Sequence, residues 1–346
     1  MSMVRIESVD IFRLIAIIAI IMIHSTAFNA DVLHDNLNYK YLYIILDQIA
    51  RFAVPFFFVI AGYFWGIKIN SGSDLIATSC GMAKRILIIF FSWSFIYLLP
   101  LDLTLIYQEG IIATCKVAYL HANKLFQHPI TLVMQGSKVH LWFLVAMLSA
   151  LFISSIFIYI KQTSTLLVLA IALYVFGILT KAYAQTPLGI DINFNTRNGP
   201  FFSTLLFVTG YLLSKKQSDY KWMLYGLIIF IFGCALHFTE IFTLWLLFDT
   251  WPKHDFVFGT YFMGLGVALA ALSNHPILRS KILSKIGKFS LGIYAVHYFF
   301  IDLLLPIDKH TDAIFWELGF VILVFVLSLL TTLLLAKNSL TKKIVV

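Results

Sequence analysis

The stretch VDIFRLIAIIAIIMIHSTAF, residues 9–28, decides the fold class of this chain. Its twenty residues match the roughly 20 that an α-helix needs to cross the hydrocarbon core of a bilayer. Similar apolar runs recur at 41–66, 86–107, 139–160, 165–181, 200–214, 222–238, 256–273, 288–305 and 313–336. The pattern predicts an all-α, polytopic integral membrane protein with about ten transmembrane helices.

The composition agrees with a chain whose solvent is a lipid bilayer. Of the 346 residues, 60% are hydrophobic and 12% are charged, whereas a soluble domain carries about 25% charged residues. The mean hydropathy is +0.90.

Cys80, Cys115 and Cys234 have no metal-ligand or disulfide-framework spacing, so we interpret them as free or buried thiols. No histidine pair has the spacing of a metal site, and we predict none.

The distribution of Lys and Arg predicts the topology. The net charge of +8 lies in short clusters between apolar runs, which argues against nucleic acid as a partner. With ten spans, one side of the membrane collects fifteen Lys and Arg and the other side eight. Since cytoplasmic loops carry the excess of positive charge, both termini are predicted to be cytoplasmic. Short loops further predict a single transmembrane domain over residues 1–346.

The first span contains three ionisable residues: Asp10, Arg13 and His24. Each costs free energy in a bilayer, which makes it a functional candidate. Asp10 and Arg13 are one helical turn apart and can form an ion pair. His24 follows Arg13 by about three turns, so both project from nearly one face, roughly 16 Å apart. The alternatives are a helix-start ion pair with a snorkelling Arg13, and a hydrogen-bonded packing histidine.

Further candidates lie at or inside other spans. His140 opens the fourth span in HLWFLVAML, and His297 lies in SLGIYAVHYFF. Arg197 precedes the sixth span, and Lys84 with Arg85 opens the third on the cytoplasmic side. The histidines could equally serve packing, and the basic pair could be a positive-inside anchor instead of an anion clamp. The chain has no GxGxxG, P-loop or GxSxG motif, which argues against dinucleotide, nucleotide and hydrolase-elbow sites.

Six fragments in order resemble one known family. They are DIFR at 10–13 followed by His24, VPFFFVIAGYF at 54–64, Lys84-Arg85, HLWFL at 140–144, TRNG at 196–199, and SLGIY at 290–294 with His297. This pattern resembles the acyltransferase-3 family of integral membrane acyltransferases, which includes bacterial O-acetylases of lipopolysaccharide and other envelope glycans. The resemblance covers almost the whole chain.

The resemblance implies a ten-helix core in the bacterial inner membrane, with cytoplasmic acetyl-CoA as acyl donor and a glycan or lipid-linked sugar hydroxyl as acceptor. It implies no permanently bound cofactor. By that likeness His24 is the catalytic histidine, and Arg13 and Arg85 support the donor. One departure concerns the Arg-x-x-Arg pair of many relatives: Met82 and Ile88 flank Arg85 at that spacing here, and only Lys84 adds charge.

The residues agree with this chemistry as a hypothesis. Acyl transfer to an alcohol needs a base for the hydroxyl proton and donors for the developing oxyanion. We predict a catalytic group of His24, Asp10 and Arg13, a coenzyme A site of Arg13, Lys84 and Arg85, and an acceptor site of His140, Trp142, Arg197 and His297. A transporter or flippase of lipid-linked glycans is the alternative from another class, since intramembrane charges also mark translocation paths. A non-catalytic subunit and another donor, such as succinyl-CoA, also stay open.

Overall fold

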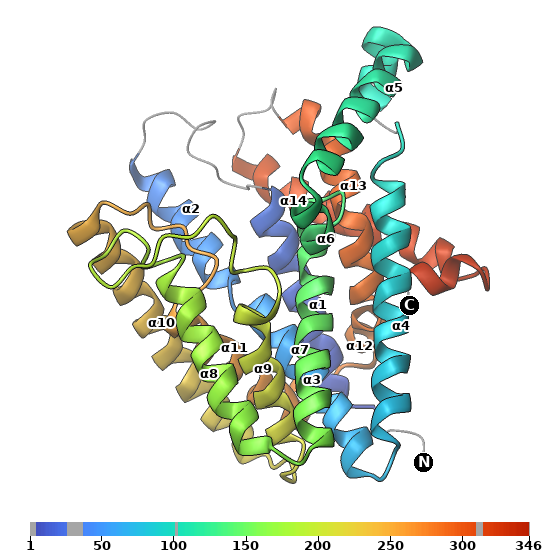
Figure 1. The fold of residues 1–346 in the computed structure, drawn as a ribbon. Helices are drawn as coiled ribbons and strands as arrows, with labels where there is room; N and C mark the ends of the chain where they lie inside the picture. The colour runs from blue at the N-terminus through green and yellow to red at the C-terminus, as the bar shows by residue number, and fades with distance from the viewer. Residues whose placement is uncertain (1–4, 26–36, 101–102, 309–313, 346) are drawn as a thin grey trace. The chain divides into compact units, whose positions relative to one another are not determined.

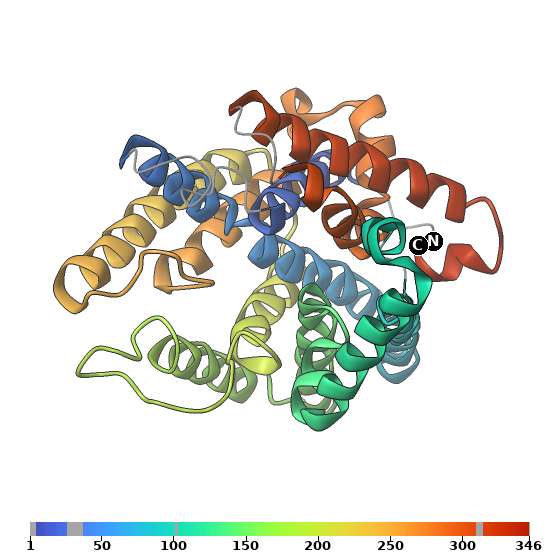
Figure 2. The ribbon, with the colours of Figure 1, turned by 90° about the horizontal axis from the view of Figure 1, so that it is seen from above.

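The computed structural model describes residues 5–25, 37–100, 103–308 and 314–345 (Figures 1 and 2). Over these residues all regular structure is helical, which confirms the predicted all-α class. Residues 26–28, 101, 102 and 313 of the predicted spans lie outside the described residues. The helices are α1 (Glu7–Ser25), α2 (Leu37–Ala50), α3 (Ala53–Asn70), α4 (Leu75–Ile96), α5 (Leu103–Gln127), α6 (Pro129–Gln135), η1 (Val139–Leu141), α7 (Trp142–Tyr159), α8 (Thr163–Leu179), α9 (Pro200–Leu213), α10 (Lys221–Phe248), α11 (Phe258–Leu272), η2 (Pro276–Leu278), α12 (Lys281–Gly287), α13 (Ser290–Asp308), α14 (Ile314–Leu335) and η3 (Thr341–Ile344).

Ten helical segments correspond to the ten predicted spans. Six are long and apolar enough to cross a membrane: Glu7–Ser25, Tyr41–Asn70, Leu75–Ile96, Val139–Tyr159, Lys221–Phe248 and Trp316–Leu335. Four shorter apolar helices are Thr163–Leu179, Pro200–Leu213, Phe258–Leu272 and Ser290–Leu304. Each overlaps one predicted span. These are the helices of a multi-pass membrane protein, while the count of ten crossings and the side of the termini stay predictions.

Large apolar side chains lie exposed on the long helices. Phe91 and Phe95 of α4 are 64% and 65% exposed, and Phe152 of α7 is 67% exposed. Ile322 and Leu334 project from α14 in the same way. Such apolar surface is unfavourable in water and favourable against lipid chains. The exposed faces therefore agree with a lipid environment.

Two predicted spans have different bounds in the structure. The helix predicted at 86–107 is α4, which begins at Leu75 and ends at Ile96. Its first two turns carry Thr78 and Ser79, whose polarity hid the helix start from a search for apolar runs. Lys84 and Arg85 consequently lie in the middle of α4, and their predicted place at its start is wrong. The span predicted at 222–238 continues as α10 to Phe248.

The chain forms two compact units, and unit 1 contains Met1–Ile20, Ile44–Ala83 and Ala146–Lys288. Within it α10 lies along α11, α9 packs against α3 and α8, and α11 contacts α3 (Figure 1). Gly62 of α3 and Gly210 of α9 let the backbones of these two helices come into contact. A Cβ atom on Gly62 would overlap the carbonyl of Phe207, and one on Gly210 would overlap that of Val59. Small residues at such crossings let helix backbones touch without lipid between them.

Unit 2 contains Ile21–Tyr43, Lys84–Val145 and Phe289–Val346. Here α13 packs along α14, and α5 contacts both α6 and α13. The hydroxyl of Tyr97, just after α4, donates to the carbonyl oxygen of Ala295 at 2.8 Å. The indole N–H of Trp93 donates to the carbonyl oxygen of Ile344, also at 2.8 Å. These bonds tie the end of α4 to α13 and to the C-terminal turn.

Candidate active site

Three histidines that are far apart in the sequence meet in unit 2. His24 lies at the end of α1, His140 in η1 and His297 in α13. The ring centroid of His297 is 5.5 Å from that of His24 and 5.1 Å from that of His140. The ring of Tyr298 lies 4.9 Å from His24 and stacks on His140 at 4.6 Å. We call these four residues the histidine cluster.

One hydrogen bond in this cluster determines which ring nitrogen of His297 carries the proton. The Nδ1–H of His297 donates to the carbonyl oxygen of Tyr294 at 2.6 Å, which leaves Nε2 of the neutral ring as an acceptor. That Nε2 and both ring nitrogens of His140 are buried and have no hydrogen-bond partner within the described part of the chain. Nδ1 of His24 lies 3.2 Å from the hydroxyl oxygen of Tyr298. Buried nitrogens without partners cost free energy, which is typical of a site that awaits a ligand.

A cavity of about 330 Å³ opens beside the histidine cluster, between the end of α4, α5 and α13. Its polar lining includes Tyr97, His121, Lys138 and Asp302. Lys138 forms a 2.5 Å ion pair with Asp302 and lies 5.2 Å from the ring centroid of Tyr298. The ring of Tyr97 lies 5.3 Å from that of His140. The cavity walls thus contact the cluster, and pockets of about 300 Å³ or more hold small ligands.

Asp10 and Arg13 form the predicted ion pair. Their atoms Oδ1 and NH1 are 2.9 Å apart, and the Asp10 carboxylate is buried. Its other oxygen accepts a 2.6 Å hydrogen bond from Arg5, which also donates to Ser284 of α12. The Arg13 guanidinium lies 5.4 Å from the ring centroid of Phe64. Asp10 therefore orients two cations, of which the sequence predicted one.

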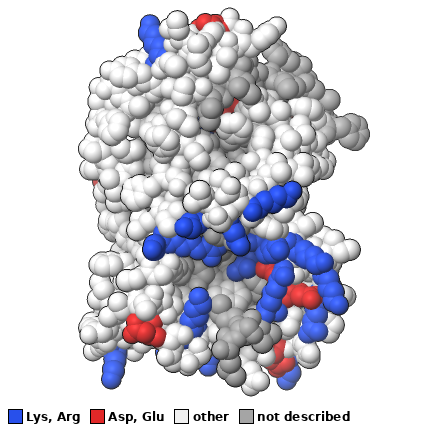
Figure 3. Space-filling view, turned by 90° about the vertical axis from the view of Figure 1, so that its right-hand side faces the viewer, with Lys and Arg blue, Asp and Glu red and all other residues white. Residues whose placement is uncertain are grey.

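The remaining predicted residues lie on three different elements. Lys84 and Arg85 are exposed on α4, and Lys and Arg side chains gather in a band on the face drawn in Figure 3. Trp142 is 5% exposed in the first turn of α7, two residues after His140. Arg13 and Arg197 belong to unit 1, whereas Lys84, Arg85 and Trp142 belong to unit 2. Their predicted convergence on a donor and an acceptor stays a prediction.

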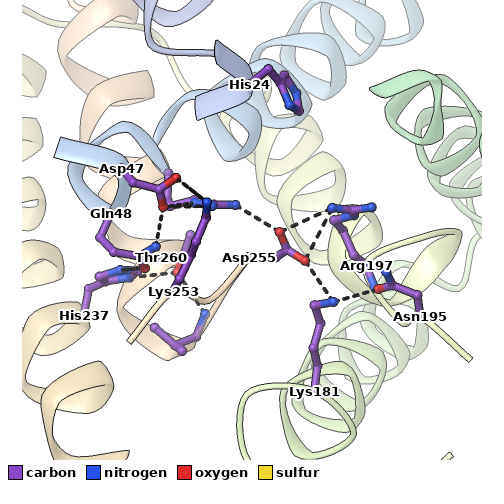
Figure 4. A network of polar contacts seen from close by, with 12 residues as sticks. His24, Asp47, Gln48, Lys181, Asn195, Arg197, His237, Lys253, Asp255 and Thr260 are labelled. Carbon is purple, nitrogen blue, oxygen red and sulfur yellow. Dashed lines mark hydrogen bonds and ion pairs between the residues drawn. The ribbon is translucent and has the colours of Figure 1, made fainter. Parts of the chain in front are cut away.

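Arg197 belongs to a network of charges in unit 1 (Figure 4). It lies 3.3 Å from Asp255, which also pairs with Lys181 at 2.9 Å and with Arg51 at 3.0 Å. Arg51, at the junction of α2 and α3, pairs in addition with Asp47 at 2.8 Å. Asp255 is therefore the carboxylate on which three cations converge. We call Arg51, Lys181, Arg197 and Asp255 the Asp255 cluster.

The charges of this cluster control two ionisable groups in the loop between α10 and α11. Burial opposes the ionisation of Asp255, but Arg197, Lys181 and Arg51 outweigh it and hold its pKa well below the ordinary value. Burial lowers the pKa of His254 to about 4; Asp255 opposes this change, whereas Arg51 and Lys181 add to it. At neutral pH the loop thus contains an ionised aspartate beside a neutral histidine.

We expect these pKa shifts to make the folded state sensitive to acid. The pKa of His254 is lower in the folded state, about 4, than its ordinary 6.5, so the unfolded chain takes up the proton first as the pH falls. Stability is therefore lost between pH 6.5 and 4, and Asp255 extends the loss to lower pH. Thermal unfolding of the detergent-solubilised protein should show this loss. His254→Gln should reduce the loss between pH 6.5 and 4, and an unchanged profile would contradict the assignment.

Sequence patterns missed the partners that complete both sites. Tyr298 follows His297 directly and could have been noted as its neighbour, but its contact with His24 joins residues 274 positions apart. Asp255 lies outside the predicted spans, so the search for intramembrane charges passed over it. Lys138 and Asp302 are likewise 164 positions apart. Only the packing of distant helices reveals such pairs.

The fold and the histidine cluster define a helical multi-pass membrane protein with a buried group of acid–base side chains. Residues 6–337 match the family model of the acyltransferase domain, the acyltransferase-3 family. The chain belongs to this family. The predicted resemblance is confirmed over nearly the whole chain.

One curated relative is a serine/alanine racemase of Enterococcus gallinarum, 27% identical over 320 residues. The match covers 84% of this chain and 40% of the racemase, so this chain spans less than half of the relative's length. No solved structure matches the chain.

Proposed function

We propose that this protein transfers an acetyl group from cytoplasmic acetyl-CoA to a hydroxyl of an envelope glycan, such as the O-antigen of lipopolysaccharide. The family supports acyl transfer as the reaction class. The observation that carries the proposal is the contact between His24, His297 and Tyr298, with His140 stacked on Tyr298. Acyl transfer needs a base at a partly enclosed place, and the cluster offers one beside a cavity that can admit an acceptor.

In the proposed reaction His24 is the catalytic base. With its Nδ1–H donating to the Tyr298 oxygen, Nε2 of His24 accepts the proton of the acceptor hydroxyl. The hydroxyl oxygen then attacks the thioester carbonyl. Collapse of the tetrahedral intermediate breaks the carbon–sulfur bond, and the coenzyme A thiolate takes the proton from the imidazolium. The reaction therefore needs only the donor, the acceptor and His24.

The donor is proposed to bind on the cytoplasmic side of a ten-span bundle in the bacterial inner membrane, with both termini in the cytoplasm. Arg13, Lys84 and Arg85 would bind the phosphates of coenzyme A. The ion pair with Asp10 fixes the place of Arg13 and assists catalysis in this way. Lys84 and Arg85 are exposed and able to meet a ligand. Arg85 can form paired hydrogen bonds to a phosphate, whereas Lys84 acts as a point charge.

The acceptor is proposed to bind next to the histidine cluster. His140 and His297 have buried ring nitrogens available for sugar hydroxyls. The cavity lined by Tyr97, Lys138 and Asp302 is of a size for a small ligand such as one sugar unit. Trp142 and Arg197 complete the proposed acceptor residues.

We expect Tyr298→Phe to lower kcat by about 10-fold, because it removes one hydrogen bond that orients His24. Tyr298 is a positioning residue, so the pH profile of kcat should shift while the KM for acetyl-CoA stays unchanged. Tyr119→Phe on the exposed side of α5 is the matched control. A change in KM alone, or equal effects of both variants, would refute this role.

The function is tested by mass spectrometry of the envelope glycan from cells with and without the protein. An added acetyl mass that depends on the protein supports the proposal. An added mass of another acyl group, such as succinyl, would change the donor but keep the reaction. A glycan of unchanged mass that appears on the outer side of the membrane only when the protein is present would favour the flippase alternative.

A further inference from the structure

Three members of the Asp255 cluster lie on loops of unit 1, and the fourth, Arg51, lies within the apolar segment Tyr41–Asn70. Lys181 and Arg197 belong to the loop between α8 and α9, and Asp255 to the loop between α10 and α11. Arg51 reaches the same carboxylate from the junction of α2 and α3. Two chain segments thus bring three cations to a carboxylate on a third segment.

The side chains of Arg51 and Lys181 and the backbone of Arg197 are held by hydrogen bonds to residues other than Asp255. The Nε and NH2 groups of Arg51 donate to the Asp47 carboxylate, which orients NH1 toward Asp255. The amide oxygen of Asn195 accepts hydrogen bonds from the Lys181 ammonium at 2.9 Å and from the Arg197 backbone N–H at 3.2 Å. Donors held in this way lose little conformational freedom when they bind an anion.

The cluster is partly open to solvent. The side chains of Lys181, Arg197 and Asp255 are 28%, 16% and 19% exposed. Three cations this close repel each other, and the carboxylates of Asp255 and Asp47 offset only part of that repulsion. A second anion that entered beside Asp255 would lower the energy of the cluster further.

Two buried polar atoms on residues next to the cluster in sequence support a ligand. Asn198 follows Arg197 and is 5% exposed, and its Oδ1 has no hydrogen-bond partner among the residues that the structure describes. His254 precedes Asp255, and its Nε2 is also buried and unpartnered in that part of the chain. An acceptor oxygen and a ring nitrogen beside a cation cluster are suited to hydroxyl groups next to an acidic group.

We propose that the Asp255 cluster is an anion-binding site that takes the carboxylate of an acidic sugar or the phosphate of a sugar phosphate. Arg197 and Lys181 bind the anionic oxygens, and Arg51 supplies the third charge. Anion binding stands on the cluster alone, whereas the choice of a sugar as the occupant rests on the proposed function.

The test measures anion binding without measuring acyl transfer. Purified protein in neutral detergent is titrated at constant ionic strength with inorganic phosphate, glucuronate or neutral glucose, and thermal unfolding is followed. We expect saturable stabilisation by phosphate and glucuronate and none by glucose. Lys181→Gln and Arg197→Gln should weaken binding at least 10-fold. Lys216→Gln, an exposed control outside the cluster, should not change it.

Asp255→Asn separates an anion site from a purely structural salt-bridge network. It removes the competing carboxylate, so phosphate should bind more tightly and restore much of the lost stability. If the network is only structural, Asp255→Asn and Lys181→Gln will both destabilise, and phosphate will restore neither; this result overturns the proposal. Should Asp255→Asn fail to fold, the proposal is tested by phosphate binding to Lys181→Gln compared with Lys216→Gln. Equal binding by these two variants overturns it.

Nanodiscs separate the two sources of an anionic group. Stabilisation by anionic phospholipid, without any response to phosphate or glucuronate, would assign the site to a lipid headgroup and overturn the assignment to an acidic sugar. Binding of glucuronate in nanodiscs of zwitterionic lipid supports it. If anions bind but no glycan is acylated, the site stands and the proposed function fails.

Discussion

We expect His24→Ala to lower the rate of glycan acylation by about 1,000-fold, the loss typical of removing a general base. The imidazole would be the group that accepts the hydroxyl proton, and an alanine at the end of α1 removes the ring that is hydrogen-bonded to Tyr298. The measurement compares acylated glycan from cells that contain equal amounts of the intact protein and the variant.

The matched control is His128→Ala, which changes an exposed histidine before α6. It should leave acylation unchanged. Because alanine at His24 could also disturb the packing of Tyr298, the variant must show the same thermal unfolding as the intact protein. A correctly folded His24→Ala protein with near-normal activity would show that His24 is not the base. Nε2 of His297 would then be the next candidate for the base.

Gly210→Ala should prevent unit 1 from folding stably, with a loss of about 3 kcal/mol or more. The new Cβ atom would overlap the carbonyl oxygen of Val59 and crowd the amide nitrogen of Tyr63, both backbone atoms of α3. Backbone cannot move aside as a flexible side chain can, so α9 must separate from α3. Gel filtration and thermal unfolding in detergent measure the loss.

Gly81→Ala is the control for that substitution. Gly81 lies in α4, and nothing within 4 Å meets a Cβ atom there. Alanine has a higher helix propensity than glycine by about 1 kcal/mol, so this variant should be as stable as the native protein or more stable. Equal behaviour of the two variants would contradict the close approach of α3 and α9.

Hydropathy predicted the helices well because the physical cause is local. A span needs about 20 apolar residues in sequence, and each predicted span overlaps an observed helix. The start of α4 was missed because Thr78, Ser79 and Gly81 interrupt the apolar pattern although their backbone stays helical. Likewise, α2 ends at Ala50 and α3 begins at Ala53, although the sequence predicted one uninterrupted span there.

Sites could be predicted only where their parts are close in sequence. The ion pair of Asp10 with Arg13 follows from helix geometry, and the structure confirms it. The sequence singled out His24, His140 and His297 separately, but no spacing relates them. Their contact depends on how α1, η1 and α13 pack, as does the convergence of Arg51, Lys181 and Arg197 on Asp255. That packing cannot be read from one sequence.

The most direct test of acyl transfer follows the labelled acetyl group itself. Purified protein is reconstituted in vesicles, acetyl-CoA with an isotopically labelled acetyl group is supplied on the cytoplasmic face, and envelope glycan is supplied on the other face. The proposed function predicts that the label appears on glycan hydroxyls as coenzyme A is released, and that His24→Ala abolishes both. Release of coenzyme A without labelled glycan, or export of glycan without any use of acetyl-CoA, would contradict it.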